Sequence, residues 1–299
     1  MLPGLMGRVV RQASEGGDRF DWHRMRDYWT QHARRAPVDR TEDPHALGNV
    51  CHPGQELAFN RYYALAQRAV FERLFDLGPG KEAAGAALDV GCGGGRWCEL
   101  FADRGYDVVG IDLQEELIEQ NRTLYPGIEF VCSSLQQYRP DREFDVVSSV
   151  TVLQHLPFDE QVTALSRLRE LTRAGGHAII LENVLDQAVH VFSRSMDGWR
   201  RLFAEAGFRC LATRRYDYNP CLRLISATAS LRSQIITGSN QPGGGSDTVA
   251  VSNMEGRLAH TVKLLRRVAI RVDGVIEPAL IKRNAALPVV HCGFLFVAE

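Results

Sequence analysis

The stretch ALDVGCGGGRW, residues 87–97, decides the fold of this chain. It begins with apolar residues typical of a buried strand and then runs into a loop that is mostly glycine. Glycine lets a ligand approach the backbone closely, and the first turn of a following helix offers backbone N–H groups that have no partner within the helix. The stretch therefore predicts a strand, a ligand-binding loop and a helix in direct succession.

Apolar strands and amphipathic helices alternate on the C-terminal side of this stretch. Such a βαβα order is typical of a parallel sheet with helices on both faces, and right-handed crossovers make that sheet doubly wound. The expected fold is therefore an α/β, Rossmann-like sheet of seven strands. Strands are expected over 86–91, 106–112, 128–134, 144–150, 177–184, 209–218 and 292–299, and helices over 96–105, 115–126, 158–176 and 195–208.

The composition is that of a globular protein with room for a large core. The chain has 299 residues, of which 45% are hydrophobic, and a net charge of −1. This balance gives no overall field that would favour a nucleic acid partner. The seven cysteines form no CxxC pair, so neither a metal site nor a disulfide framework is expected. The first residues lack the apolar segment of a signal peptide, and no apolar run is long enough to cross a membrane, so a cytoplasmic protein is expected.

The spacing of acids and glycines in the loop narrows the choice of ligand. Asp89, Gly91, Gly93 and Gly95 alternate with other residues, and Arg96 stands where the dinucleotide fingerprint requires a third glycine. The lysine of a phosphate-binding P-loop is missing as well. An acid at the end of the second strand, Asp112, can accept both hydroxyls of a ribose. The pattern predicts a nucleoside rather than a pyrophosphate, although each acid could instead be a cap or turn residue.

Six ordered motifs resemble those of the class I S-adenosylmethionine-dependent methyltransferases. Together they cover roughly residues 55–216, and the last strand of the chain completes the pattern. Within this family, the sequence is most similar in general character to the members that methylate oxygen in small molecules, glycans or lipids. The motifs are ALDVGCGGGRW at 87–97, GIDLQEELI at 110–118, FVCSSLQQY at 130–138, FDVVSSVTVLQHLP at 144–157, GGHAIILENV at 175–184 and SMDGWRRLFAEAGFRCLATRRY at 195–216.

The resemblance implies S-adenosylmethionine as cofactor and assigns a role to each matching position. In this family the carboxylate at Asp112 holds the ribose, and an aspartate often stands at the position of Ser134, where it reaches the adenine amine. A serine hydroxyl can also form a hydrogen bond there. The residues implied at the cofactor are Asp89, Gly91, Gly93 and Gly95 along the methionine part, Leu113, Ser134 and Leu135 around the adenine, and Val150 and Thr151 near the methionine amine.

Methyl transfer from a sulfonium requires that the acceptor atom lie in line with the methyl group in a site that excludes water. A hydroxyl acceptor benefits from a general base. His155, after the fourth strand, is the first candidate, because the ordinary pKa of histidine suits proton transfer near neutral pH. Glu182, at the end of the fifth strand, is the second. Either residue could instead have a structural role.

The regions outside the alternating core are expected to cover the site. Residues 1–54 form an N-terminal extension and lid helix, 55–217 the cofactor-binding core, 218–290 a helical insertion that caps the acceptor, and 291–299 the last core strand. The lid and the helix that follows it supply aromatic residues and an arginine, which could equally be ordinary packing residues between helix and sheet. These residues are Tyr28, Trp29, Arg61, Tyr62 and Tyr63, and Arg61 is also expected at the cofactor.

The insertion contains a basic helix over 256–272. This helix could recognise an anionic or glycosyl acceptor, could lie on a membrane surface near a lipid-linked acceptor, or could simply present a solvated basic face. The expected activity is O-methylation of a small-molecule, glycan or lipid-linked acceptor. N- or C-methylation, an oxidoreductase and a degenerate cofactor-binding module are the alternatives. The motifs lack the signature of enzymes that methylate nucleic acid bases, so no nucleic acid partner is expected.

Overall fold

The structure is a computed structural model that describes residues 27–29, 31, 40–51, 57–80, 85–185, 191–218, 220–221, 248–285 and 289–299. Part of the expected insertion, residues 222–247, lies outside the described residues, as does most of the expected lid before residue 40.

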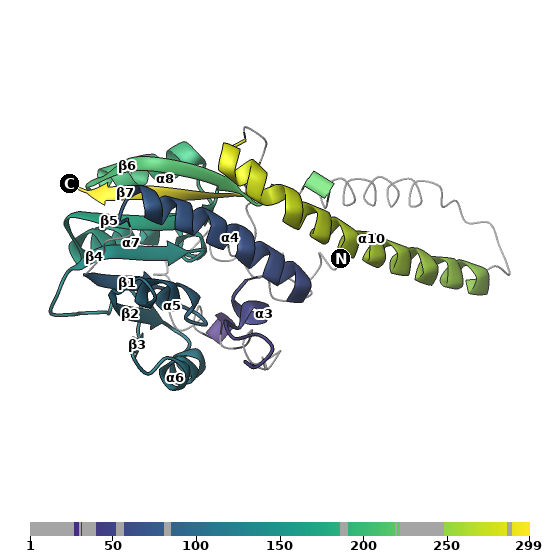
Figure 1. Ribbon diagram of the computed structural model, residues 1–299, viewed down its shortest axis with the longest axis horizontal. Coiled ribbons are helices and arrows are strands. Elements are labelled where there is room, and N and C mark those ends of the chain that lie inside the picture. The colour runs from purple at the N-terminus through teal and green to yellow at the C-terminus, as the bar shows by residue number, and fades with distance from the viewer. Residues whose placement is uncertain are drawn as a thin grey trace, which may run out of the picture.

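A seven-stranded sheet in the order β3-β2-β1-β4-β5-β7-β6 forms the centre of the molecule (Figure 1). β1 to β5 pair in parallel, and β7 runs antiparallel to both β5 and β6. The expected seven-stranded Rossmann-like fold is thereby confirmed. The strands are β1 (Ala86–Val90), β2 (Asp107–Asp112), β3 (Glu129–Cys132), β4 (Phe144–Val150), β5 (Thr172–Asn183), β6 (Phe208–Tyr216) and β7 (His291–Ala298).

The antiparallel direction of β7 follows from the path of the chain before it. β6 ends at Tyr216, opposite His291, where β7 begins. The connection between them is the helix α10 (Thr248–Arg283), which ends near this same edge of the sheet. The chain leaves the sheet at the carboxyl end of β6 and re-enters it at that same end of the strands. β7 therefore runs antiparallel to β5 and β6.

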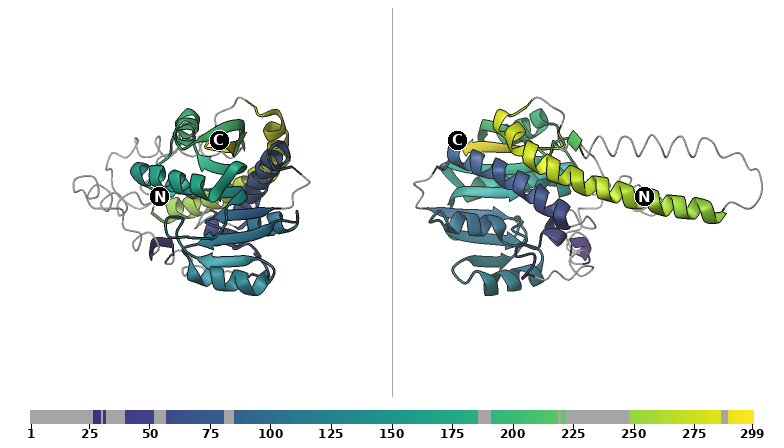
Figure 2. Two further views of the ribbon diagram at one scale, coloured as in Figure 1. Left: turned by 90° about the vertical axis from the view of Figure 1, so that its left-hand side faces the viewer. Right: turned by 45° about the vertical axis from the view of Figure 1, so that its right-hand side comes forward.

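Helices cover both faces of the sheet, as the alternating pattern predicts (Figure 2). Successive residues of β7 point to opposite faces. Gly293 lies against Val70 and Leu74 of α4 (Leu57–Leu77), whereas Phe296 stacks on Phe203 of α8 (Met196–Glu205) at 4.0 Å between ring centroids. α4 and α8 therefore cover opposite faces. The remaining elements are α3 (Leu47–Val50), α5 (Arg96–Ala102), α6 (Glu115–Leu124), the short 3-10 helix η1 (Leu153–His155) and α7 (Phe158–Leu171).

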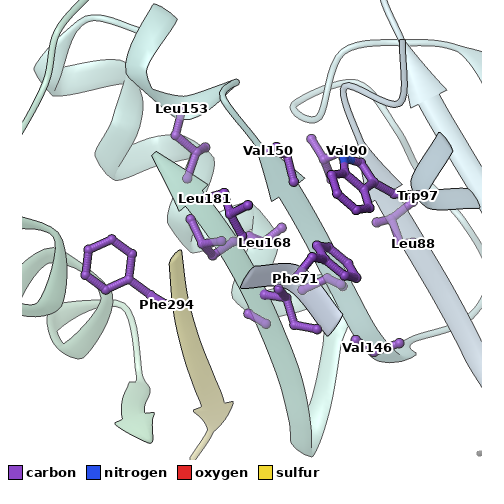
Figure 3. Close-up of a cluster of buried hydrophobic side chains, with 14 of the residues drawn as sticks. Phe71, Leu88, Val90, Trp97, Val146, Val150, Leu153, Leu168, Leu181 and Phe294 are labelled. Atoms are coloured by element: carbon purple, nitrogen blue, oxygen red, sulfur yellow. The ribbon is translucent and has the colours of Figure 1, made fainter. Parts of the chain in front are cut away.

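The hydrophobic core lies between these layers. Phe71 of α4 is fully buried and stacks on Trp97 of α5 at 4.3 Å between ring centroids. Figure 3 shows side chains from α4, β1, β4 and β5 gathered in this cluster. Burial of such side chains stabilises the fold by about 1.5–3 kcal/mol each. This core holds the carboxyl ends of β1, β2 and β4 in fixed register.

Several boundaries differ by a few residues from those expected, most clearly at the junction of α7 and β5, and one helix is longer. α7 ends at Leu171, five residues early, because β5 begins at Thr172 and pairs there with Phe144. Gly175, which adopts a left-handed φ of 73°, cannot continue a regular helix. α10 is a single helix of 36 residues that contains the basic segment. Among the described residues, none of the helices is both long and apolar enough to cross a membrane.

Candidate functional site

A cavity opens at the carboxyl ends of β1, β2 and β4. This is the edge of an open α/β sheet at which ligands bind. Asp89, Gly95, Glu182 and Arg61 do not line the cavity. The expected residues that do line it are Gly91, Gly93, Asp112, Leu113, Ser134, Leu135, Val150, Thr151 and His155.

The glycine loop after β1 adopts a backbone that side chains would not tolerate. Gly91, Gly93 and Gly95 have φ values of 70°, 50° and 82°, in the left-handed region that favours glycine. A Cβ at Gly91 would also overlap Val152 in the turn after β4, and one at Gly93 would lie 2.9 Å from Val50 Cγ1. The glycines thus let the loop curl against its neighbours while its backbone lines the cavity.

Asp112 stands at the end of β2 with its carboxylate fixed by the backbone. Oδ2 accepts a hydrogen bond from Gly93 N at 2.9 Å, and Oδ1 accepts one from Gln114 N at 2.9 Å. Burial raises the pKa of the Asp112 carboxyl, and these N–H donors act in the opposite direction. The contact with Gly93 connects the acid directly to the glycine loop, so both form one wall of the cavity.

Asp89 supports the loop from within the core instead of facing the cavity. Its carboxylate is fully buried and accepts hydrogen bonds from Ser148 Oγ at 2.6 Å and Cys98 Sγ at 3.7 Å. Burial raises its pKa to about 7. Gly95 also lies away from the cavity, against the ring of Tyr125. The structure therefore places neither residue where the resemblance implied a direct contact with the methionine part.

The turn after β4 also lines the cavity and is held by Glu182. Thr151 has a φ of 57°, an uncommon value for a β-branched residue. In the next three residues, the backbone N–H groups of Val152, Leu153 and Gln154 donate to the Glu182 carboxylate at 3.2, 2.9 and 3.1 Å. Such a network can stabilise a strained backbone.

This geometry contradicts the expectation that Glu182 is a general base. The residue is fully buried, it does not line the cavity, and burial raises its pKa to about 8. A general base has to reach the acceptor directly or through one water. Glu182 instead holds the backbone of the turn, through the hydrogen bonds that its carboxylate accepts.

His155 lies at the end of this turn, in η1, and lines the cavity. Its ring packs edge to face with Trp29 at 4.9 Å between centroids, and Trp29 lines the cavity too. The side chain of the preceding residue, Gln154, accepts a hydrogen bond from Asn183 N at 2.8 Å. His155 is therefore an imidazole at the wall of the cavity, carried by a turn with two separate supports.

The other expected lid residues lie away from the cavity. Arg61 is exposed, donates to the carbonyl of Glu42 at 2.6 Å and does not line the cavity. Tyr62 donates to Glu277 Oε2 of α10 at 2.9 Å, and Tyr63 packs on His291. Tyr28 packs on Trp29. Of the five residues, Trp29 alone lines the cavity.

Sequence reasoning missed two glutamines at the cavity. Gln136 is half-buried, and both polar atoms of its amide are buried without a hydrogen-bond partner; the same holds for Oε1 of Gln114. Buried polar atoms are nearly always paired in folded proteins. Both residues follow directly on strand-end motifs, GIDLQ and SSLQQ, so attention to polar residues just after each strand could have found them. They are candidates to form hydrogen bonds with a ligand.

A segment before α4 supports the glycine loop from outside the cavity. Arg40 Nη2 donates to Gly94 O at 3.1 Å and to Asn121 Oδ1 at 3.0 Å, while Asn121 Nδ2 donates to Gly93 O at 2.7 Å. A Cβ at Gly94 would overlap the backbone of His45. The loop is thus held between this segment and Asp112.

Comparisons with known proteins agree with the fold. The family model of a methyltransferase domain matches residues 87–176. The chain is similar to a ubiquinone biosynthesis O-methyltransferase of Aliivibrio fischeri (strain MJ11), with 34% identity over 96 residues, which is 30% of this chain and 40% of that protein. It is also similar to a trans-aconitate 2-methyltransferase of Methylobacterium radiotolerans, with 32% identity over 38% of this chain and 45% of that protein.

The chain thus spans less than half the length of these two curated relatives. Among solved structures, a magnesium protoporphyrin IX methyltransferase from Synechocystis PCC 6803 with bound S-adenosylmethionine matches with a TM-score of 0.50 at 19% identity. The match covers 67% of this chain and 92% of that one. A likeness at this level of identity supports the fold.

Proposed function

We propose that this chain is a class I S-adenosylmethionine-dependent methyltransferase and that it transfers a methyl group to a hydroxyl of a small-molecule acceptor. The match of residues 87–176 to a methyltransferase domain supports the proposal. The observation that carries the proposal is the composition of the cavity. It combines a carboxylate at Asp112, the glycine backbone of Gly91 and Gly93, and an imidazole at His155. A nucleoside and a reacting group need these chemical groups within one cavity.

The residues of the cavity fit the parts of S-adenosylmethionine. The Asp112 carboxylate can accept hydrogen bonds from the ribose hydroxyls, and the apolar side chains of Leu113 and Leu135 can pack against the adenine. The amide of Gln136, whose donor and acceptor atoms are both without partners, can pair with the polar edge of the base. When bound, the cofactor supplies a methyl group on a positively charged sulfur.

His155 is the proposed general base. Its imidazole can take the proton of an acceptor hydroxyl as that oxygen attacks, and such catalysis contributes typically about 10²–10⁴-fold. The edge contact with Trp29 restricts the imidazole plane and shields that part of the cavity from water. Glu182 fixes the turn before His155 and thereby the distance of the base from the glycine loop.

The relatives include enzymes named for a quinone pathway and for trans-aconitate, which differ widely in charge and size. A small-molecule acceptor is common to both, and a glycan or lipid-linked acceptor is a narrower version of the proposal. N- or C-methylation would use the same cofactor on a different acceptor atom. A degenerate module would bind cofactor without turnover.

The first experiment is calorimetric titration with S-adenosylmethionine, S-adenosylhomocysteine and NADH. We expect binding of the first two ligands and none of the third. Asp112→Ala should weaken cofactor binding by about 1.5–3 kcal/mol, the usual contribution of hydrogen bonds to a charged group. Asp103→Asn, an exposed acid at the end of α5, is the matched control and should bind normally. Binding of NADH alone would refute the proposal.

The second experiment is an acceptor screen by methyl transfer, followed by His155→Ala with an accepted substrate. We expect turnover to fall by about 10²–10⁴-fold while cofactor affinity stays nearly unchanged. Equal turnover by the variant would assign His155 a structural role. Cofactor binding without transfer to any acceptor would favour the degenerate module.

A further inference from the structure

The long helix α10 exposes an unusual amount of apolar surface. It extends beyond the edge of the sheet in Figures 1 and 2. Large apolar side chains that are exposed elsewhere in the described residues are scattered over several elements, but six of them fall within thirteen consecutive residues of α10. We call these six the α10 stripe: Leu264, Leu265, Val268, Val272, Val275 and Ile276.

The stripe lies on the side of the helix that faces away from the domain. Its members recur at spacings of three and four, so they share one face. The other face is buried: Asp273 Oδ1 accepts from Cys221 N at 3.0 Å, and Glu277 accepts from Tyr62 Oη and from Tyr218 N. The core therefore already occupies the inner face of α10, while Val275, at 80% exposure, points outward.

The charges of α10 divide between the same two faces. Both acids among its described side chains, Asp273 and Glu277, are buried against the core. Every described charged side chain that is exposed on this helix is basic: Arg267, Arg271, Lys282 and Arg283. The outer surface of α10 is thus apolar and positively charged, although the chain as a whole has a net charge of −1.

We propose that the α10 stripe and its basic flank dock on the surface of an anionic lipid bilayer. A helix with an apolar stripe and flanking arginines lies in the plane of the interface, where its apolar side chains enter the acyl boundary and the arginines reach the headgroups. A second copy of the chain fits less well, because two such surfaces would bring arginines together, and among the side chains of α10 that the structure describes no carboxylate is exposed to pair with them. Charge complementarity therefore favours anionic lipid.

The position of the helix connects this surface with the cavity. α10 meets the sheet where β7 begins, opposite the carboxyl end of β5 at Asn183, and the cavity opens at this carboxyl edge. Docking would hold that edge of the sheet near the lipid. The proposed docking surface consists of residues outside the cavity, so it does not depend on which acceptor is methylated.

The test is flotation of the full chain with vesicles of phosphatidylcholine alone or mixed with phosphatidylglycerol. We expect binding to the mixed vesicles, weaker binding to the neutral ones, and release at high salt, because salt screens the attraction. Arg267→Gln with Arg271→Gln should weaken binding about thirtyfold, since each basic residue near an anionic surface contributes about 1 kcal/mol. Val268→Ser with Val275→Ser should weaken it at least about tenfold.

Matched controls distinguish binding through the α10 stripe and its basic flank from nonspecific binding through other exposed apolar or basic side chains. Leu65→Ser removes an apolar side chain that is 68% exposed on α4, and Arg201→Gln removes an exposed arginine of α8; both should bind as the unaltered chain does. Absence of binding to anionic vesicles would overturn the proposal. So would a dimer in sedimentation experiments that the Val268 and Val275 substitutions abolish while vesicle binding stays unchanged.

Discussion

Two neighbouring loops line the cavity, and each contains left-handed backbone that is stabilised in a different way. The glycine loop, residues 90–95, adopts left-handed φ values with glycines, which permit them at little steric cost. The turn after β4, residues 150–155, adopts one with Thr151, and the Glu182 carboxylate holds the following backbone with three hydrogen bonds. The backbone conformation of the glycine loop is therefore permitted by its own glycines, whereas that of the turn after β4 depends on a side chain about thirty residues away.

The largest effect is expected where the two loops touch. Gly91→Ala would place a Cβ on Val152 and would also strain a residue at φ 70°. Overpacking and the left-handed backbone together should lower the free energy of unfolding by about 3 kcal/mol. Chemical denaturation measures this. Gly175→Ala is the matched control, because its φ of 73° is the same but its Cβ would meet open space; it should lose only about 1 kcal/mol. Equal losses would show that the contact between the loops is unimportant.

Glu182→Gln tests the support of the second loop. The carboxylate accepts three N–H groups, and an amide would turn a donor toward at least one of them. We expect a loss of about 2–3 kcal/mol in the free energy of unfolding, because buried donors lose their acceptor. Turnover should fall with little change in cofactor affinity. Glu205→Gln, an exposed acid on α8, should stay within about 0.5 kcal/mol. A variant as stable as the unaltered chain would contradict the positioning role.

The same carboxyl predicts how stability depends on pH. Burial raises the pKa of Glu182 to about 8 from an ordinary value near 4.5, so between these values the folded state holds a proton that the unfolded state releases. The free energy of unfolding should therefore fall as pH rises through this window, by at most about 1.4 kcal/mol per pH unit for one group. Asp89, with a pKa of about 7, adds to this trend. Denaturation across the window should give a flatter profile for Glu182→Gln; an unchanged slope would exclude Glu182 as a source.

The contrast between the loops also shows what sequence could and could not predict. Local patterns predict the order of strands and helices, the glycine loop and the position of Asp112. The hydrophobic periodicity and the spacing of glycines can be recognised within a few consecutive residues. The function of Glu182 could not be predicted, since its partners come from another strand end. Sequence placed it beside the acceptor, whereas folding buries it behind the turn. The antiparallel β7 likewise depends on where α10 ends, which no local pattern records.

Arg40 tests the outer support of the glycine loop. Its guanidinium donates to Gly94 O and Asn121 Oδ1, which hold the loop on the side away from the cavity. Arg40→Ala should lower the free energy of unfolding by about 1–1.5 kcal/mol and weaken cofactor binding by a similar amount or less, because the loop backbone loses a hydrogen-bond donor. Arg201→Ala on α8 should change neither quantity. Unaltered cofactor affinity in calorimetry would show that the glycine loop keeps its binding conformation without the Arg40 contact.

The smallest effect is expected for Gln136, but here stability and cofactor affinity are expected to change in opposite directions. Both polar atoms of its amide are buried without a partner, so Gln136→Leu should leave the stability of the free chain unchanged or raise it slightly. Cofactor affinity should fall by about 1 kcal/mol, because the amide would have paired with the base. Gln137→Leu, at the exposed neighbouring position, is the control and should leave affinity unchanged. A Gln136→Leu variant that is both less stable and equally tight in binding would show that the amide serves the fold. Higher stability of the free chain together with weaker cofactor binding would instead show that the amide of Gln136 serves to bind the ligand.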